Sequence, residues 1–354
     1  MKNILIFSMF LLVFSGCKKP ENVIENYDRA TLLKSLADNV IKPAYNGLNN
    51  SIPALQTAAN NFAATPNSAN LQALQIAFDT TLAKWELCEV YDIEIADANI
   101  FNANVGTTPI NASQIETFLA TTSPMNQAAV AGTGSTRKGL AAIEYLIFGD
   151  ENSILDSFAN PQRALYLQAL VNDIQVQTSA VYNDWNGGNS YSNFISQTQL
   201  DVSGSLNLLF NALTAHIETV RAAKIGFPAG LESTAHPASC EYVLSGNSLN
   251  NIRANNESWR QLFTGNGGVG INDYLDHVNA QYNNASLSST LTDEFVTIKQ
   301  KTDAISVPLD QAITAQSSAV ADLHLELKKL TVLTKVDGAS DLGVIITFSD
   351  NDGD

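Results

Sequence analysis

Chemistry is first expected at Glu144, a lone carboxylate in a strongly apolar helical segment. Residues 137–149 read RKGLAAIEYLIFG, and on a helix Glu144 shares a face with Ala141 and Phe148. Burying an unpaired carboxylate costs several kcal/mol, so this side chain needs a cation, a metal, hydrogen-bond donors or an open cleft. Two interpretations stand: a glutamate at the wet edge of its helix or paired with an arginine, or a polar anchor inside a binding cleft.

A second candidate is a run of carboxylates beside Trp85, Cys88 and Tyr91. Its members are Glu86, Glu89, Asp92, Glu94 and Asp97. Oxygen-rich clusters suit hard cations such as ferric iron or calcium. We expect one helix over about 69–98, on which neighbouring carboxylates of the run share faces. A solvated helix face is the ordinary explanation of such a run, and a cation site is the alternative.

In the second half of the chain, Arg221 and Lys224 share a helix face, with Glu218 one turn earlier. This pattern predicts either a surface ladder of ion pairs or the anion-holding edge of a cleft. The histidines are expected to be structural, because none has a second histidine within helical reach and no HExxH stretch occurs. They are His216, His236, His277 and His324. Without a Gly-x-Ser-x-Gly elbow or a Cys–His pattern, we expect no catalytic residue.

Composition narrows the class of function. The 354 residues carry a formal net charge of −16, which disfavours binding to nucleic acid. Cys88 and Cys240 are the only cysteines besides Cys17, and the sequence leaves open whether they form a disulfide. Asp350, Asp352 and Asp354 are spaced like the start of a calcium loop, but the later ligands are missing, so an acidic tail is expected.

The N-terminus has the parts of a bacterial lipoprotein signal. Lys2 precedes an apolar run over 4–14, and small residues lead directly to Cys17, as in a lipobox. The run is too short to span a bilayer as a mature helix. We expect a signal peptide over 1–16, lipidation of Cys17 and a tether over 17–22. Lys18 follows in place of an acidic retention signal, so we expect an outer-membrane lipoprotein, facing the periplasm or the exterior.

The remaining sequence predicts an all-α fold of two packed helical bundles with little or no β structure. Apolar residues recur at spacings of three and four, and we expect Pro43 to end the first helix. The break at 186–190 (NGGNS) divides an N-terminal helical domain, 23–186, from a C-terminal one, 190–354. The best strand signal is 344–348, VIITF.

Three segments resemble the imelysin family. Residues 139–149 are similar to its G-x-H-x-x-E helix, with Gly139 and Glu144 matching and Ala141 at the histidine position. The segment 221–233 is similar to a second-half motif of the family, and 342–354 is similar to its C-terminus. The resemblance covers nearly the whole mature chain, and it implies a two-domain helical protein with its site between the domains.

The resemblance also implies a function. The family is named after a peptidase activity and is associated with iron uptake. Because Ala141 offers no donor atom, the peptidase interpretation weakens, and we expect a non-catalytic binding protein for iron, haem or another divalent metal. Glu144 would be its metal-binding residue, with Gly139, Ala141, Arg221, Lys224 and Glu232 around the cleft. Alternatives are a metallopeptidase with a modified site, or a partner-binding subunit of an outer-membrane receptor.

Overall fold

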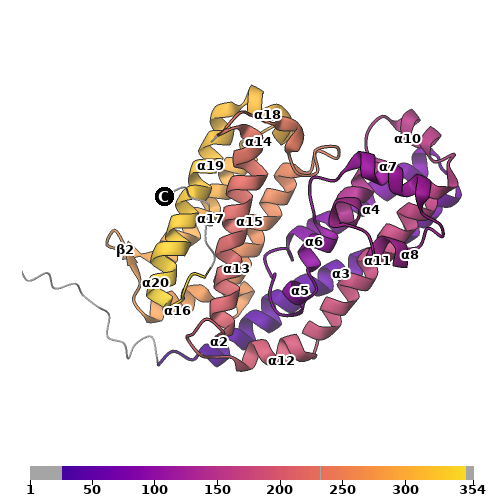
Figure 1. The fold of residues 1–354 in the computed structure, drawn as a ribbon. Helices are drawn as coiled ribbons and strands as arrows, with labels where there is room; N and C mark the ends of the chain where they lie inside the picture. Colours follow the sequence, from indigo (N-terminus) through magenta and orange to yellow (C-terminus); the bar gives the residue numbers. More distant parts are fainter. Residues whose placement is uncertain (1–25, 232, 348–354) are drawn as a thin grey trace, which may run out of the picture.

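The structure is a computed structural model that describes residues 26–231 and 233–347, and these residues are helical almost throughout (Figure 1). The expected all-α fold is therefore confirmed. The predicted signal peptide, Cys17, the tether, Glu232 and the acidic tail lie outside the described residues.

One group of helices is built around three long ones, α3, α4 and α11, which lie side by side. The helices of this part of the chain are α2 (Arg29–Leu36), α3 (Lys42–Ala64), α4 (Ser68–Glu86), α5 (Ile95–Ala98), α6 (Phe101–Val105), α7 (Ala112–Thr121), α8 (Gln127–Ala131), α9 (Gly139–Ile147), α10 (Glu151–Ser157) and α11 (Pro161–Trp185). Fully buried aromatic rings fill the space between the long helices: Tyr45 stacks on Trp185 at 6.2 Å, and Trp85 meets Phe101 at 5.3 Å.

A second group contains the helices of the later chain. They are α12 (Asn189–Ser196), α13 (Ser205–Thr219), α14 (Phe227–Ala229), α15 (Ser248–Thr264), α16 (Ile271–His277), α17 (Leu287–Asp303), α18 (Leu309–Ala315), α19 (Ser317–Val332) and α20 (Ala339–Leu342). A short antiparallel hairpin, β1 (Gln281–Tyr282) and β2 (Ala285–Ser286), precedes α17. Helix α15 packs on α17, α17 on α19, and α13 on α19.

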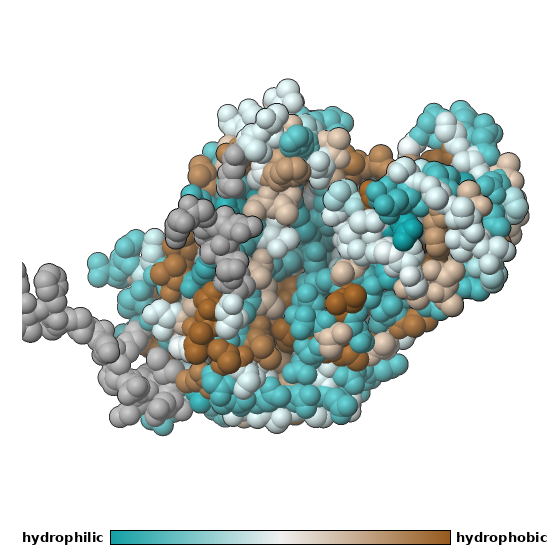
Figure 2. Space-filling model, viewed as in Figure 1, coloured by the Kyte–Doolittle hydropathy of each residue, from teal (hydrophilic) through white to brown (hydrophobic). Residues whose placement is uncertain are grey.

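The two groups meet where α4 lies against α15, while α12 packs on both α2 and α13 at the base of the molecule (Figure 1). The division of the chain into separate domains at 186–190 stays a prediction. Figure 2 shows the surface hollowed between the two groups, with hydrophilic residues along much of the hollow.

Local sequence explains where the long helices begin. Pro161 is the first residue of α11, where its missing N–H costs nothing, and the Asn160 side chain accepts the Gln162 N–H at 3.0 Å. Helix α4 begins in the same way, because the Asn67 side chain accepts the Asn70 N–H at 2.9 Å.

Three local predictions are wrong. Pro43 does not end the first helix, because a π turn over Ala37–Ile41 shifts the hydrogen bonding just before it and α3 continues. Helix α4 ends at Glu86 and does not reach 98. Residues 344–347 form no strand; the Ile345 N–H donates to the Asn207 side chain at 2.7 Å, so α13 takes the place of a partner strand.

Within the described residues, none of the helices is long and apolar enough to cross a membrane.

Candidate functional site

The end of α4 places two glutamates between the helix groups. After Glu86 the chain turns, with the Cys88 N–H donating to the Trp85 carbonyl at 2.7 Å and the Tyr91 N–H to the Cys88 carbonyl at 2.9 Å. This turn leaves Glu86 fully buried against α15 and directs Glu89 toward α13. The expectation of a solvated face is therefore wrong for Glu86 and Glu89, because the second helix group covers them.

Four oxygen atoms surround the Lys224 ammonium, and we call them the oxygen cage. Lys224 Nζ lies 2.9 Å from Glu86 Oε2, 2.6 Å from Glu89 Oε2, 2.9 Å from Glu241 Oε2 and 3.1 Å from Asn255 Oδ1. The Lys224 side chain is only 7 % exposed. The predicted surface ladder is therefore wrong for Lys224, which instead joins the two helix groups from the inside.

A histidine and a tryptophan extend the cage toward α13 and α15. The Trp259 indole N–H donates to His216 Nδ1 at 2.9 Å, so that nitrogen carries no proton. The neutral ring then has its proton on Nε2, which donates to Glu89 Oε2 at 3.0 Å. Because an indole nitrogen can only donate, protonating His216 would break this arrangement, and burial indeed lowers the pKa of His216.

The three carboxyls of the cage differ in their protonation. Burial alone would raise the pKa of Glu89, but the Lys224 charge and the hydrogen bonds from Lys224 and His216 hold it well below its usual range. Burial and the Glu241 charge raise the pKa of Glu86, and burial also raises that of Glu241. Burial opposes the charged form of Lys224, yet its three carboxyl neighbours raise its pKa. The cage is thus an ammonium held by an excess of acid groups.

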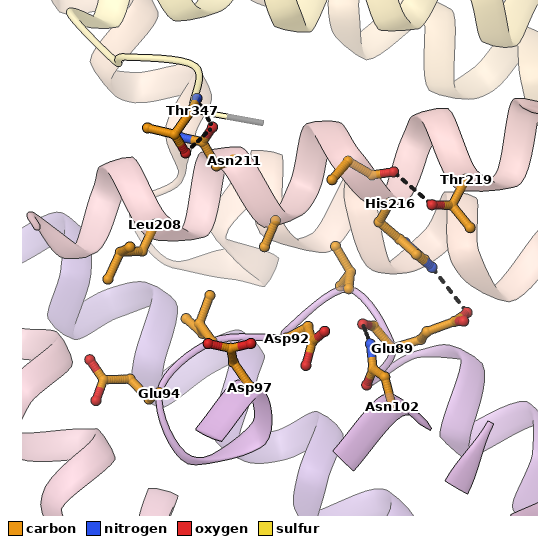
Figure 3. Close-up of a pocket in the computed structure, with 14 residues that line it drawn as sticks. Glu89, Asp92, Glu94, Asp97, Asn102, Leu208, Asn211, His216, Thr219 and Thr347 are labelled. Atoms are coloured by element: carbon orange, nitrogen blue, oxygen red, sulfur yellow. Dashed lines mark hydrogen bonds and ion pairs between the residues drawn. The ribbon is translucent and has the colours of Figure 1, made fainter. Parts of the chain in front are cut away.

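One side of Glu89 faces a cavity of about 500 Å³ between the helix groups (Figure 3). Its acidic wall carries Asp92, Glu94 and Asp97 as well as Glu89, and the opposite wall is α13, with Asn211 holding Thr347 at the rim. Among the described residues that line it there is no lysine or arginine. We call it the acidic cavity; its charge favours a positively charged ligand.

A second cavity of about 410 Å³ lies on the other side of Glu89. Lys224 and Glu241 line it from the cage, and Phe227, half exposed, stands in its wall. The segment 106–109 supplies much of the rest. The two cavities share Glu89, Asn102 and Thr219, so the Glu89 carboxylate can be reached from both.

Unusual backbone conformations occur beside these cavities. Glu94, Ile100 and Tyr242 have positive φ angles of 54°, 47° and 45°. Such conformations cost about 1–3 kcal/mol each for residues other than glycine, and they persist where the surrounding structure imposes them. Here they shape the acidic wall and the loop that follows Glu241.

Glu144 makes a different contact. Its Oε1 accepts the Ser245 N–H at 2.8 Å and the Ser245 hydroxyl at 2.7 Å, which ties α9 to the loop before α15. Burial raises its pKa. Glu144 lines neither of the two cavities described above. Of the cation, metal, hydrogen-bond donors or open cleft that this carboxylate was expected to need, the structure supplies hydrogen-bond donors.

Replacing Glu144 with alanine should lower the free energy of unfolding by about 1–3 kcal/mol, because the partly buried Ser245 N–H loses its acceptor. Urea unfolding monitored by circular dichroism measures this. Ser245→Ala, which removes only the hydroxyl donor, should cost less than half as much. Equal stability of Glu144→Ala and the parent would contradict a structural role for this carboxylate.

The other predicted site residues are spread over the interface. Gly139 begins α9 with a φ of 78°, and a Cβ there would lie 2.4 Å from the Val105 carbonyl oxygen. Ala141 is buried in the same helix, and Arg221 lies in the π turn Val220–Gly226 that also carries Lys224. Glu232 is outside the described residues. The structure therefore brings Lys224, but not Glu144, into direct contact with the carboxylates of the acidic run.

The remaining candidates lie apart from the cage. His236 stacks on Phe227 at 5.0 Å, His277 lies 5.1 Å from the Tyr27 ring, and His324 is buried beside Gly226. Cys88 and Cys240 are both buried free thiols. Across the part of the chain that the structure describes, no three His, Cys, Asp or Glu side chains are placed to hold a metal ion together.

Sequence reasoning did not identify Glu241, Asn255 or Trp259 as site residues. Asn255 and Trp259 are four residues apart on α15, and such a polar and aromatic pair on one helix face is the signal that points to the buried contact. Glu241 follows Cys240 in an irregular segment without periodicity, so no local pattern identifies it.

Comparison with known proteins shows the family to which the chain is related. The family model described as Peptidase_M75, imelysin, matches residues 41–334. A curated relative, iron-regulated protein A of Synechococcus elongatus, is 24 % identical over 322 residues, which cover 88 % of this chain and 84 % of the relative.

Solved structures share the fold. An imelysin-like protein from Psychrobacter arcticum has a TM-score of 0.74 at 18 % identity, covering 90 % of this chain and 97 % of its own. A structure from Parabacteroides distasonis, named for an iron-regulated protein A precursor, has a TM-score of 0.75 at 16 % identity, covering 92 % and 97 %. Because the family model matches most of the sequence, the chain belongs to the imelysin family.

Proposed function

We propose that this chain is a non-catalytic binding protein of the cell envelope, working in iron or metal acquisition, and that it takes a positively charged ligand in the acidic cavity. The observation that carries the proposal is the lining of that cavity: four carboxylates, with neither lysine nor arginine among the described residues around it. A solvated cation or a metal complex of net positive charge fits this chemistry.

The surroundings of Glu89 support a binding role. Lys224 and His216 lower the pKa of this carboxylate and so favour its ionised form, which attracts a cation. The name of the curated relative, iron-regulated protein A, supports iron as the metal. Haem fits the acidic cavity less well, because its propionates would face carboxylates.

The peptidase alternative has weaker support from the residues. A catalytic zinc needs three protein ligands and an open position, and the described residues hold no such trio. Cleavage of an unfolded protein by the purified chain, abolished by a chelator, would establish the alternative. A stoichiometric partner that co-purifies without any small ligand would favour a receptor subunit.

Equilibrium dialysis of the mature chain against ferrous iron, ferric iron, zinc, calcium and haem tests the proposal. We expect at least one cation to bind at one site per chain, and Asp92→Asn/Asp97→Asn to weaken it at least tenfold. Asp293→Asn, an exposed acid on α17, is the matched control and should leave binding unchanged. Haem binding alone, or equal binding by all three proteins, would contradict the acidic cavity as the site.

Cation binding should also depend on pH through Asp92. Burial, then the charges of Asp97 and Glu89, raise the pKa of Asp92 to about 6. Asp92 is therefore mostly charged at pH 7 and mostly neutral at pH 5, so affinity should fall about tenfold between pH 7 and pH 5. Isothermal titration at several pH values measures this fall, and Asp92→Asn should flatten the profile over that range.

Export and lipid anchoring complete the proposal. The lipobox-like sequence before Cys17 supports an outer-membrane location, and fractionation of cells carrying Cys17→Ser tests it. The variant should leave the membrane fraction. If it stays bound to the membrane as tightly as the parent, the anchor is not at Cys17.

A further inference from the structure

The second cavity differs from the acidic cavity in the chemistry of its wall. Its volume of about 410 Å³ lies in the range of small-molecule sites, and both helix groups contribute apolar groups to its lining. These groups are Ala103, Pro109, Ala223 and the Phe227 ring. Apolar walls around a few polar groups are typical of sites for organic ligands. We propose that the second cavity binds a small organic molecule that has an apolar body and a hydrogen-bond-donating head.

The apolar wall includes an aromatic ring that the described chain leaves half uncovered. Phe227 is 51 % exposed at the start of α14. The His236 ring stacks on it at 5.0 Å with an interplanar angle of 22°, and this contact limits the movement of the phenyl ring. Ala223, four residues earlier, is also exposed and lines the same cavity. An apolar body that lies against these two side chains removes their exposed surface from water.

The Lys224 ammonium in this cavity has no donor left for a ligand. Lys224 is the only lysine or arginine among the described residues that line the cavity. An ammonium has three N–H donors, and four oxygens lie within 3.1 Å of Lys224 Nζ. An anionic head would therefore meet carboxyl groups without a free positive charge to balance it, so the cavity disfavours anions.

Other polar groups on this side also donate within the protein. Thr107 Oγ1 and Thr219 Oγ1 each donate to the carbonyl four residues earlier, at 2.7 Å and 3.0 Å. Asn102 Nδ2 donates to the Glu89 carbonyl at 2.9 Å. A hydroxyl whose proton is engaged in this way keeps lone pairs that accept hydrogen bonds. The polar side of the cavity therefore offers mainly acceptors, which select a ligand head that donates.

Glu89 supplies the charged acceptor for that head. Its carboxylate receives hydrogen bonds from Lys224 Nζ at 2.6 Å and from His216 Nε2 at 3.0 Å, and both are on Oε2. Oε1 of the same carboxylate remains for a donor that enters the cavity. An O–H or N–H head would donate to it in a charge-assisted hydrogen bond, which is stronger than one between neutral groups.

Ligand-observed NMR titration of the full mature chain with phenylbutanol, its methyl ether and phenylbutyrate tests the proposal. The three probes share a phenylalkyl body and differ in the head. We expect the alcohol to bind at one site per chain, and the ether and the carboxylate to bind at least tenfold more weakly. An ether or a carboxylate that binds as tightly as the alcohol would show that the cavity does not select a donating head. That result overturns the proposal, as does an alcohol that does not bind.

Variants of the two exposed wall residues locate the site. Ala223→Leu fills the cavity and should weaken binding of the alcohol at least tenfold, and Phe227→Ala should weaken it at least threefold. Ala54→Leu changes an exposed alanine of α3 that lines neither cavity, so this matched control should bind like the parent. Asp92→Asn/Asp97→Asn should also bind the alcohol like the parent, because these two carboxylates line the acidic cavity and not the second one.

The same variants separate failure here from failure of the proposed function. Loss of cation binding in Asp92→Asn/Asp97→Asn, with alcohol binding intact, would support two distinct cavities. Alcohol binding that is lost in that double variant would place the probe in the acidic cavity and overturn the proposal. Binding that both Ala223→Leu and Phe227→Ala leave undiminished overturns it too, and a thermal melt by circular dichroism checks that each variant is folded.

Discussion

Replacing Lys224 with methionine is expected to lower the free energy of unfolding by about 3–5 kcal/mol, because it leaves buried carboxylates without their cation. Three carboxyls and one amide converge on this ammonium, so the loss is not confined to a single ion pair. Urea unfolding at pH 7 measures the change. Lys301→Met, which removes an exposed ion pair with Asp322, is the control and should cost less than about 1 kcal/mol.

The loss of stability in Lys224→Met should become smaller as the pH falls. In the parent, the pKa of Glu89 is held below its unfolded value, so its contribution to stability is present above the unfolded pKa and is lost as the pH falls through the folded one. Without Lys224, burial dominates and raises the carboxyl pKa values. Stability of the variant should then rise as the pH falls from 8 toward 5. If the variant were less stable than the parent by the same free energy at pH 8 and at pH 5, lost packing and not lost charge would explain the difference.

Replacing Gly139 with alanine is expected to lower the free energy of unfolding by about 3 kcal/mol, the second large effect we predict. Its φ of 78° alone costs a residue with a Cβ about 1–2 kcal/mol, and the new atom would lie 2.4 Å from the Val105 carbonyl oxygen, which adds about 1–3 kcal/mol of overpacking. Thermal or urea unfolding of the variant measures the sum. A loss of this size would mean that Gly139 is needed for the close approach of α9 to α6.

Gly47→Ala provides the contrast. Gly47 lies inside α3, and a Cβ there would meet only the Cδ atom of the Lys84 side chain, at 3.6 Å. Alanine should stabilise the helix by about 0.5–1 kcal/mol. If Gly139→Ala were as stable as the parent, the approach of α9 to Val105 would not restrict this position.

The sequence contained enough to predict the all-α fold, because apolar spacing of three and four residues reports a buried helix face wherever the helix packs. It could not show that α4 stops at Glu86, since the apolar period continues through Cys88 and Tyr91 while tertiary contacts bend the chain. The π turn at Ala37–Ile41 escaped prediction for a similar reason: it changes hydrogen bonding without changing the pattern of apolar residues.

The site was predicted in part. Glu89 and Lys224 were both noticed, but as separate surface features, because 135 residues separate them and only the packing of the two helix groups brings them together. Glu144 drew attention as a carboxylate among apolar residues, and its donors come from Ser245, 101 residues away. Local patterns identify residues that need a partner, and tertiary structure decides which partner they find.

Anomalous diffraction at the iron edge, on crystals of the mature chain grown with ferrous iron, tests the central claim most directly. The account predicts one iron peak per chain in the acidic cavity, next to Glu89, Asp92 and Asp97, with Lys224 still in the oxygen cage. An iron peak at Glu144, or crystals soaked with iron that show no peak in the acidic cavity, would contradict it.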